Sequence, residues 1–447
     1  MVEWQLPAEL TLWINHLSQP LHARLRHRLP LLMLGMLFAQ GRRTVASWLR
    51  GAALGNEYRR YYYFLGSLGR KTGWVASLLL RRAVAALVPD DRLLFALDDT
   101  PTKRFGPQVE GAGIHHNPTP GPADQKFLYG HVWVTVAWVV HHPRWGAIGL
   151  PLRALLYVRQ KQLALLQRLY GVTFQTKLEM AAELVEWLVA WLRFLDKPLW
   201  VVVDGAYAGR PFLKRALAAG VVVVSRLRRD AALRSVPVPP RPGERKPSGR
   251  PPIYGKESLS LAKRAGHRRG WQTETFVLYG EAVSKTYKTF LATWEPAGGL
   301  IRVVLVREED GWDAFFCTLA TATVADILGA VADRATIEQD FHDLKEVHGT
   351  GKQQVRHYWS SIAVYHLNMW LHTLIELWAW KKTHRQLCDR SPSPWDTVER
   401  RPSHADRRNA LRRQSIQEAI RQAQGRRRLT PKIRAVIRGL LRLATAS

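Results

Sequence analysis

Apolar residues recur at helical spacing through residues 1–90, with arginine between them. The stretch 41–55 predicts two short helices around a turn, and the segment 58–66 that follows is dense in Arg and Tyr. Arginine beside aromatic rings suits phosphate contact and base stacking, so a helical DNA-binding region is one interpretation. A helical cap packed on the next part of the chain fits the same pattern equally well.

Short apolar runs replace the helical period in residues 91–230. Five of them predict strands: 93–100, 130–142, 145–158, 199–204 and 221–227. Amphipathic stretches predict helices at 177–195 and 210–220. A group of strands followed by alternating helices and strands is typical of α/β proteins, so we expect a mixed sheet flanked by helices.

A second β-rich region interrupts this order. The segment 236–252 is rich in Pro, Gly and Arg and predicts a loop. Strand-like runs follow it at 274–283, 286–294, 300–308 and 314–321. The helical period then returns. We therefore divide the chain into five parts: a helical N-terminal region (1–90), a first part of an α/β core (91–230), a β-rich insertion with a return strand (231–321), core helices (322–380) and a basic C-terminal tail (381–447).

The charge of the chain points to a polyanionic partner. Lys and Arg number 66 against 36 Asp and Glu, which gives a formal net charge of +30. The part from Arg400 to Ser447 alone carries 14 basic and two acidic residues. An excess of this size concerns partners and not fold, and nucleic acid is the usual polyanion. The tail is therefore expected to be a helical or partly disordered polybasic segment that binds DNA, or a solvated one.

Cysteine content and hydropathy suggest the compartment. Cys317 and Cys388 are the two cysteines, too few for a disulfide framework or a zinc motif. The apolar run 29–38 is too short to span a bilayer, and the first residues do not read as a signal peptide. We expect a cytoplasmic protein, associated with the nucleoid through DNA and not with a membrane.

Acidic residues follow two of the predicted strands. Asp98 and Asp99 end the first strand, and Asp204 ends a later one. Ligands collect at strand ends in sheets covered by helices, and an acid beside an apolar strand needs solvent, a partner or a metal. Each acid also has a simpler explanation, because Asp often caps a helix or begins a turn.

A third acid lies on the predicted helix 333–349. On a helical wheel of about 100° per residue, Arg334, Glu338 and Lys345 fall within about 40° of each other. The neighbouring stripe is apolar and consists of Ile337, Phe341 and Leu344. The helix would thus dock one face on a sheet and present a carboxylate between two cations at its edge. An ordinary surface ion pair four residues apart is the alternative.

The order of these features resembles the RNase H-like DDE transposases, in which two strand aspartates precede an insertion and a helix glutamate. The segment 334–345 is similar to the Tyr-Arg-Glu-Lys signature of insertion-sequence family 4. Arg334, Glu338 and Lys345 match that signature in identity and spacing, whereas Val331 stands in the Tyr position. A role of that Tyr hydroxyl is therefore not carried over. The likeness covers about residues 35–350 and does not extend to the tail.

The two aspartate motifs also resemble those of this family. Residues 98–100 are similar to its Asp-Asp-Thr motif, in which the aspartate directly before Thr is catalytic, so the resemblance selects Asp99 over Asp98. Residues 204–207 are similar to its second motif, which makes Asp204 the second acid. The stretch around Arg42 and Arg43 is similar to helical DNA-binding regions of the group.

The resemblance implies a catalytic and metal-binding triad of Asp99, Asp204 and Glu338. Two Mg²⁺ ions, or Mn²⁺ in their place, would be held by these carboxylates, with Asp99 bridging them. Two such ions about 4 Å apart can stabilise both the attacking and the leaving oxygen of a phosphodiester displacement. The family chemistry is cleavage at transposon ends followed by strand transfer into target DNA. Double-stranded DNA and a homodimer in the DNA complex are the implied partners.

Several basic and aromatic residues have two interpretations. Arg334 and Lys345 are expected to contact DNA phosphates. Lys103, with Arg104 beside it, would grip the scissile strand or lie in a solvated loop. For the His pairs at 115–116 and 141–142 we favour loop or phosphate contacts over metal binding. For Trp294 we favour core packing over base stacking.

Two other functions fit the same residues. One is an RNase H-like, structure-specific DNA nuclease that cuts without joining ends. The other is a catalytically silent DNA-binding protein derived from a transposase, although all three acids are present here. Cutting and joining of labelled DNA ends would separate the three.

Overall fold

The structure is a computed structural model of the 447-residue chain. It describes residues 5–87, 90–117, 125–238, 249–388, 390, 395–397 and 399–424, with four single positions after 429. The predicted loop 236–252 therefore lies mostly outside the described residues, as do most residues of the predicted tail after Gln424. No described helix is long and apolar enough to cross a membrane.

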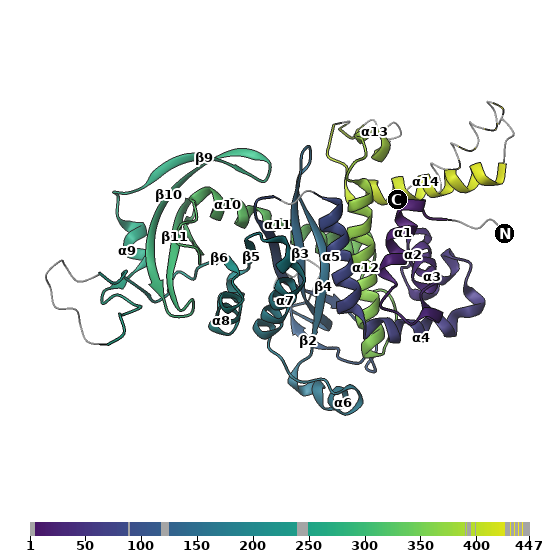
Figure 1. The fold of residues 1–447 in the computed structure, drawn as a ribbon, viewed down its shortest axis with the longest axis horizontal. Coiled ribbons are helices and arrows are strands. Elements are labelled where there is room, and N and C mark those ends of the chain that lie inside the picture. The colour runs from purple at the N-terminus through teal and green to yellow at the C-terminus, as the bar shows by residue number, and fades with distance from the viewer. Residues whose placement is uncertain are drawn as a thin grey trace.

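Helices occupy the N-terminal region, as the apolar spacing predicted. They are α1 (Ala8–Leu17), α2 (Arg28–Phe38), α3 (Val45–Gly51), α4 (Tyr58–Gly69) and α5 (Thr72–Ala86), with short 3₁₀ turns at Ala23–Leu25 and Gly55–Glu57. The stretch 41–55 forms one α-helix and not two, because the Thr44 side chain accepts a hydrogen bond from the Ser47 amide and starts the helix there. These helices form one end of the molecule (Figure 1).

The predicted mixed sheet is present and has the strand arrangement of an RNase H-like core. Its strands are β1 (Leu93–Lys103), β2 (Gly113–His116), β3 (Phe127–His142), β4 (Gly146–Tyr157), β5 (Leu199–Val203) and β6 (Val222–Arg226). β1, β3 and β4 are antiparallel neighbours, whereas β5 runs parallel to β1 and β6 runs parallel to β5. β2 extends the edge of β3, as a short strand that the sequence pattern did not indicate.

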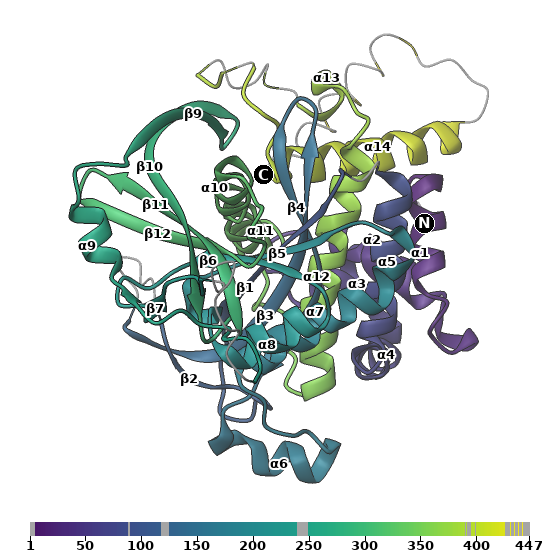
Figure 2. The same cartoon turned by 60° about the vertical axis from the view of Figure 1, so that its left-hand side comes forward.

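Helices cover both faces of this sheet (Figure 2). One face packs on α7 (Lys177–Leu192) and α8 (Arg210–Ala218). The other packs on α10 (Val324–Asp333) and α11 (Ala335–Glu346). The long helix α12 (Tyr358–Ala379) contributes to the apolar clusters on both sides. The helix α6 (Gln160–Tyr170) follows β4 and was not predicted.

The β-rich insertion is built onto the same sheet. Its elements are β7 (Leu233–Arg234), β8 (Ser258–Leu259), α9 (Leu261–Gly266), β9 (Gln272–Leu278), β10 (Glu281–Trp294), β11 (Gly299–Glu308) and β12 (Gly311–Cys317). The return strand β12 pairs antiparallel with β6, so the described strands form one continuous sheet. Tyr279 and Gly280 both have positive φ and form a tight hairpin turn, which divides the predicted strand 274–283 in two. Trp294 is buried against Phe316, as favoured from the sequence.

The helix expected over 333–349 is present as α11, which is a few residues shorter, and Arg334 lies at its junction with α10. The C-terminal tail differs from the prediction. The tail contributes α13 (His384–Leu387) and α14 (His404–Gln424), and α14 packs against α12 and α2. Arg407, Arg408 and Arg412 of α14 are buried, so these tail arginines are structural and do not form a solvated basic surface.

Candidate active site

The alternation of side chains along β1 separates its two aspartates. Leu93, Phe95 and Leu97 pack in the apolar cluster that contains α7, whereas Leu94 and Ala96 pack in the cluster that contains α11. Successive side chains of a strand point to opposite faces. Asp98 therefore continues on the α11 side, and Asp99 lies on the α7 side.

Asp204 lies beside Asp98 on the same face. Leu97 of β1 is aligned with Val203 of β5 in parallel register, so the next positions along the two strands are Asp98 and Asp204. Asp204 has an extended backbone, with φ −66° and ψ 155°, and its carboxylate accepts the Ala206 amide at 3.4 Å. The carboxyl ends of two adjacent parallel strands thus present two acids to α11.

Arg334 connects this pair with the helix glutamate. Its Nη1 lies 2.8 Å from Asp98 Oδ2, and its Nη2 lies 2.6 Å from Glu338 Oε1. The Glu338 side chain is 57% exposed, whereas that of Asp98 is 19% exposed. The break between α10 and α11 places Arg334 at the start of α11, where one guanidinium reaches both the strand and the next turn of the helix.

The electrostatics of this face are those of crowded acids. Burial raises the pKa of Asp98 to about 6, and the carboxylates of Asp99 and Asp204 act in the same direction. The Arg334 guanidinium and the Asp99 amide oppose this rise in the pKa. A cation lowers the cost of crowding carboxylates, and oxygen donors alone select hard ions such as Mg²⁺, Mn²⁺ or Ca²⁺. Asp98, Asp204 and Glu338 supply oxygen donors of this kind, with the Arg334 guanidinium between the first and the third.

Asp99 is held by different partners. Lys177 Nζ, at the start of α7, lies 2.6 Å from Asp99 Oδ2, and the Tyr207 hydroxyl donates to Oδ1 at 2.7 Å. Burial first, and then the Asp99 carboxylate, raise the pKa of Tyr207 well above its usual range, so the phenol stays protonated and donates. Asp99 also lines a cavity with His115 and Arg159. Its carboxylate is thus fixed by a cation and a phenol on the side away from Glu338.

The other predicted site residues are distributed around this centre. Lys345 lies on the same stripe of α11 as Glu338, about two turns further along the helix. Partial burial lowers the pKa of its amine. Lys103 is exposed at the end of β1. Arg42 is exposed before α3, whereas Arg43 is half-buried and its guanidinium donates to the Ala39 carbonyl. Arg43 is thus less accessible than Arg42.

The structure also shows the positions of Arg104 and of the histidine pair 141–142. Arg104, expected beside Lys103 in a loop, is buried and donates to His131 Nδ1 at 3.1 Å. His142 is buried and stacks on Trp145, and its Nε2 lies 3.0 Å from the Trp380 carbonyl, so its role is packing. His141 pairs with Asp333 at 2.9 Å and with Asp90 at 3.3 Å.

His141 pairs with Asp333, the residue directly before Arg334. This ion pair predicts a pH-dependent stability of the fold. Hydrogen bonding to Asp333 raises the pKa of His141 to about 9. The stabilisation is complete below the unfolded pKa of about 6.5 and is lost as the pH rises through about 9. Because the side chain is 47% exposed, we expect at most about 1 kcal/mol. The free energy of unfolding of wild type relative to His141→Gln should therefore fall between pH 6.5 and 9, measured with urea at both values. An unchanged difference would contradict this assignment.

Sequence reasoning missed the two partners of Asp99. Lys177 reads as an ordinary first residue of an amphipathic helix, and its partner lies 78 positions away. Tyr207 is part of the 204–207 motif, but the motif does not predict that the Tyr207 hydroxyl donates to Asp99 on β1. Thr176, which caps α7 together with Glu179, is the local signal that fixes where Lys177 begins the helix.

Comparison with protein families places the chain in a class. The profile of the family described as DDE superfamily endonuclease matches residues 16–277. This is more than half of the 447 residues, and the chain belongs to this family. The match includes Asp98, Asp99 and Asp204 and ends before Glu338. No curated protein matches the chain. DDE endonucleases act on DNA with divalent metal ions.

Proposed function

We propose that the chain is a DDE transposase that cuts DNA at transposon ends and joins the ends to target DNA, as a member of the insertion-sequence family 4 type. The observation that carries this proposal is the pairing of Asp98 with Asp204 on adjacent parallel strands, linked to Glu338 through Arg334. This arrangement brings together acids from distant parts of the sequence, with Asp98 and Glu338 more than 200 positions apart.

We assign the metal-binding carboxylates to Asp98, Asp204 and Glu338. The sequence resemblance selected Asp99 for its position before Thr100, but the strand alternation supports Asp98 because it shares a face with the other two acids. Two Mg²⁺ ions bound there would activate the attacking oxygen and stabilise the leaving oxygen of the phosphodiester. Arg334 orients Asp98 and Glu338 toward one another. Asp99 binds Lys177 and Tyr207 on the α7 side of the sheet, and these contacts position the end of β1.

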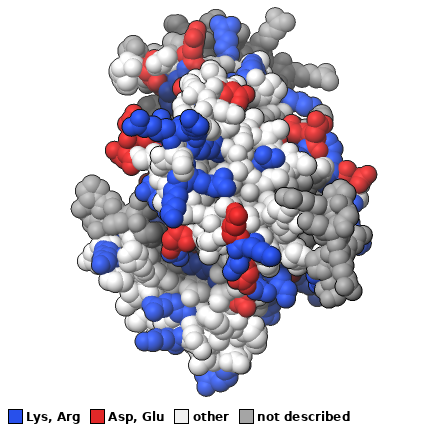
Figure 3. Space-filling view, turned by 90° about the vertical axis from the view of Figure 1, so that its left-hand side faces the viewer, with Lys and Arg blue, Asp and Glu red and all other residues white. Residues whose placement is uncertain are grey.

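The surface supports DNA as the substrate. Lys and Arg side chains are spread over the face that the insertion presents, with smaller groups of Asp and Glu between them (Figure 3). Exposed basic residues of the insertion include Arg250, Lys256, Lys263, Arg268 and Arg269. Neutralised phosphates release counterions, so binding should weaken steeply with salt. A homodimer on paired DNA ends belongs to the same proposal.

The proposed function is tested with labelled DNA ends of the segment that encodes the chain. The purified protein with Mg²⁺ is expected to cut these ends and to join their 3′ hydroxyls to a target plasmid, and EDTA should abolish both. Glu338→Gln should lower the cleavage rate by about 100-fold or more, because a metal ligand is lost, while DNA affinity changes little. Cleavage is followed on gels and affinity by fluorescence anisotropy.

Arg264→Gln is the matched control, since its guanidinium lies over the Phe290 ring in the insertion and away from the acids. It should cut at the wild-type rate. Cutting without joining would favour the structure-specific nuclease, and binding without cutting would favour a silent DNA-binding protein. A Glu338→Gln protein that cuts at the normal rate would overturn the assignment of the third acid.

A further inference from the structure

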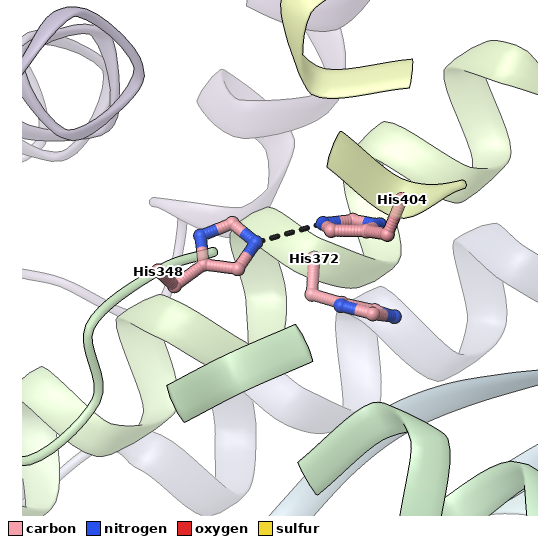
Figure 4. A group of neighbouring side chains, drawn as sticks. All are labelled: His348, His372 and His404. Atoms are coloured by element: carbon pink, nitrogen blue, oxygen red, sulfur yellow. Dashed lines mark hydrogen bonds between the residues drawn. The ribbon is translucent and has the colours of Figure 1, made fainter. Parts of the chain in front are cut away.

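Three histidines that are far apart in sequence meet in the interior (Figure 4). His348 follows the end of α11, His372 lies in the middle of α12, and His404 is the first residue of α14. All three are buried, with at most 4% of each residue exposed. Each offers a ring nitrogen, and these nitrogens lie within 4.8 Å of one another.

The ring nitrogens of two of these histidines are already oriented by carboxylates. His404 Nδ1 lies 2.6 Å from Glu376 Oε1, and His372 Nε2 lies 3.4 Å from Asp340 Oδ1. Histidines that bind metals characteristically donate the N–H of their other nitrogen to a carboxylate, which turns the lone pair of the remaining nitrogen toward the ion. Here the remaining nitrogens are His404 Nε2 and His372 Nδ1.

Neither His404 Nε2 nor His372 Nδ1 has a carboxylate or carbonyl as a hydrogen-bond partner among the described residues. His404 Nε2 faces His348 Nε2 at 2.8 Å, a contact in which two lone pairs repel unless a proton or a cation lies between them. His372 Nδ1 and Asp340 Oδ2 are buried and have no hydrogen-bond partner among the described residues. Unpartnered buried polar atoms are costly, so two in one cluster indicate a ligand.

The carboxylate that orients His404 is itself held in the interior. Glu376 pairs with the guanidinium of Arg407, and both side chains are buried. The orientation of the His404 ring is therefore fixed from two elements, α12 and α14.

We propose that His348, His372 and His404 bind one structural zinc ion, with Asp340 and Glu376 orienting two of the three rings. Four-coordinate zinc holds His nitrogens at about 2.0–2.1 Å, which places ligand nitrogens about 3.3 Å apart. The separations here, from 2.8 Å to within 4.8 Å, bracket that value. The His372 ring stacks on that of His404 with centroids 3.8 Å apart, so it has to turn out of this stack to share the ion. Nitrogen ligands favour zinc over magnesium, which separates this site from the oxygen-only DDE acids.

The fold contains two devices that bring these ligands together. Ser403 and Asp406 cap the start of α14 reciprocally, which fixes the position of His404. Gly149 of β4 lets Asp340 approach, because a Cβ there would lie 2.0 Å from Asp340 Oδ2. The zinc ion would therefore clamp α14 and α12 to the end of α11, the helix that carries Glu338.

The test is zinc content by elemental analysis of protein purified without a polyhistidine tag, loaded with Zn²⁺ and dialysed against metal-free buffer. Wild type should retain about one zinc per chain, and Co²⁺ in its place should give the visible absorption of a tetrahedral site. Removal of zinc with a chelator should lower the melting temperature by about 5 °C. Wild type that retains less than about 0.1 zinc per chain would overturn the proposal, whatever the variants do.

Variants locate the ion. His404→Gln and His348→Gln should lose the zinc, whereas His342→Gln, an exposed histidine of α11, should retain it. Asp204→Asn should also retain it, because that acid belongs to the DDE face. Loss of zinc from Asp204→Asn but not from His404→Gln would place the ion at the DDE acids and contradict the site. Since the wild-type measurement needs no variant, misfolding of a variant leaves the test intact.

Discussion

Asp98→Asn is expected to lower the rate of DNA cleavage by roughly 1000-fold, which corresponds to about 4 kcal/mol of lost transition-state stabilisation. The substitution keeps the shape of the side chain and removes the charge that faces Asp204 and Glu338 on the α11 side of the sheet. A metal site built from three carboxylates loses one third of its ligand charge. Initial rates with saturating DNA and Mg²⁺ give the measurement, and anisotropy gives the DNA affinity, which should change little.

Asp99→Asn is the matched comparison, because Asp99 directly follows Asp98 in β1 and its side chain points to the opposite face of the sheet. Its carboxylate positions β1 through Lys177 and Tyr207, so we expect a loss of about 10- to 100-fold, as for residues that support metal ligands. Raising the Mg²⁺ concentration should recover activity of Asp99→Asn and not of Asp98→Asn. The reverse ranking of the two variants would assign the first metal ligand to Asp99, as the sequence resemblance does.

Glu376→Gln is expected to destabilise the fold by about 3–5 kcal/mol, because removal of one partner leaves a buried charge uncompensated. Glu376 is 2% exposed in the middle of α12. It accepts from His404 at 2.6 Å and from the buried guanidinium of Arg407. These interactions, with Arg407 the strongest favourable influence, lower the pKa of Glu376, so its stabilisation is present above the unfolded pKa and is lost as the pH falls.

Urea titrations at pH 7 measure the destabilisation, and a second series below the unfolded pKa of about 4.5 should show a smaller difference between the variant and wild type. Glu308→Gln is the control, since Glu308 pairs with Lys285 at 3.0 Å on the surface and its side chain is 41% exposed. An exposed pair contributes about 0–1 kcal/mol, so this variant should differ little from wild type. Equal stability of Glu376→Gln and Glu308→Gln would show that α14 docks without the buried ion pair.

The strand ends and the helix that carries Glu338 could be predicted from the sequence, because apolar runs and acids at their ends are local signals. The choice between Asp98 and Asp99 could not. Adjacent residues of a strand differ only in the face they point to, and that face is decided by which helix covers it. α11 is more than 200 residues away from β1 in sequence, so no local pattern contains this information.

The histidine cluster escaped prediction for a similar reason. His348, His372 and His404 are separated by 24 and 32 positions, which is no metal-ligand spacing, and each lies in a different element. The tail was expected to be a basic segment, and its charge did not reveal that Arg407 and Arg408 are buried. Burial of arginine depends on acceptors elsewhere, here Glu376 and the carbonyls at the end of α2.

The pairing of β6 with β12 has a mechanical consequence. The insertion shares backbone hydrogen bonds with β6, which in turn pairs with β5, the strand that precedes Asp204. It therefore cannot swing like a hinged flap over a bound duplex. A double helix that touches both the insertion and the acids must itself kink or open to reach them. Base steps that bend easily should then be cut faster than stiff ones, even at positions that no side chain contacts.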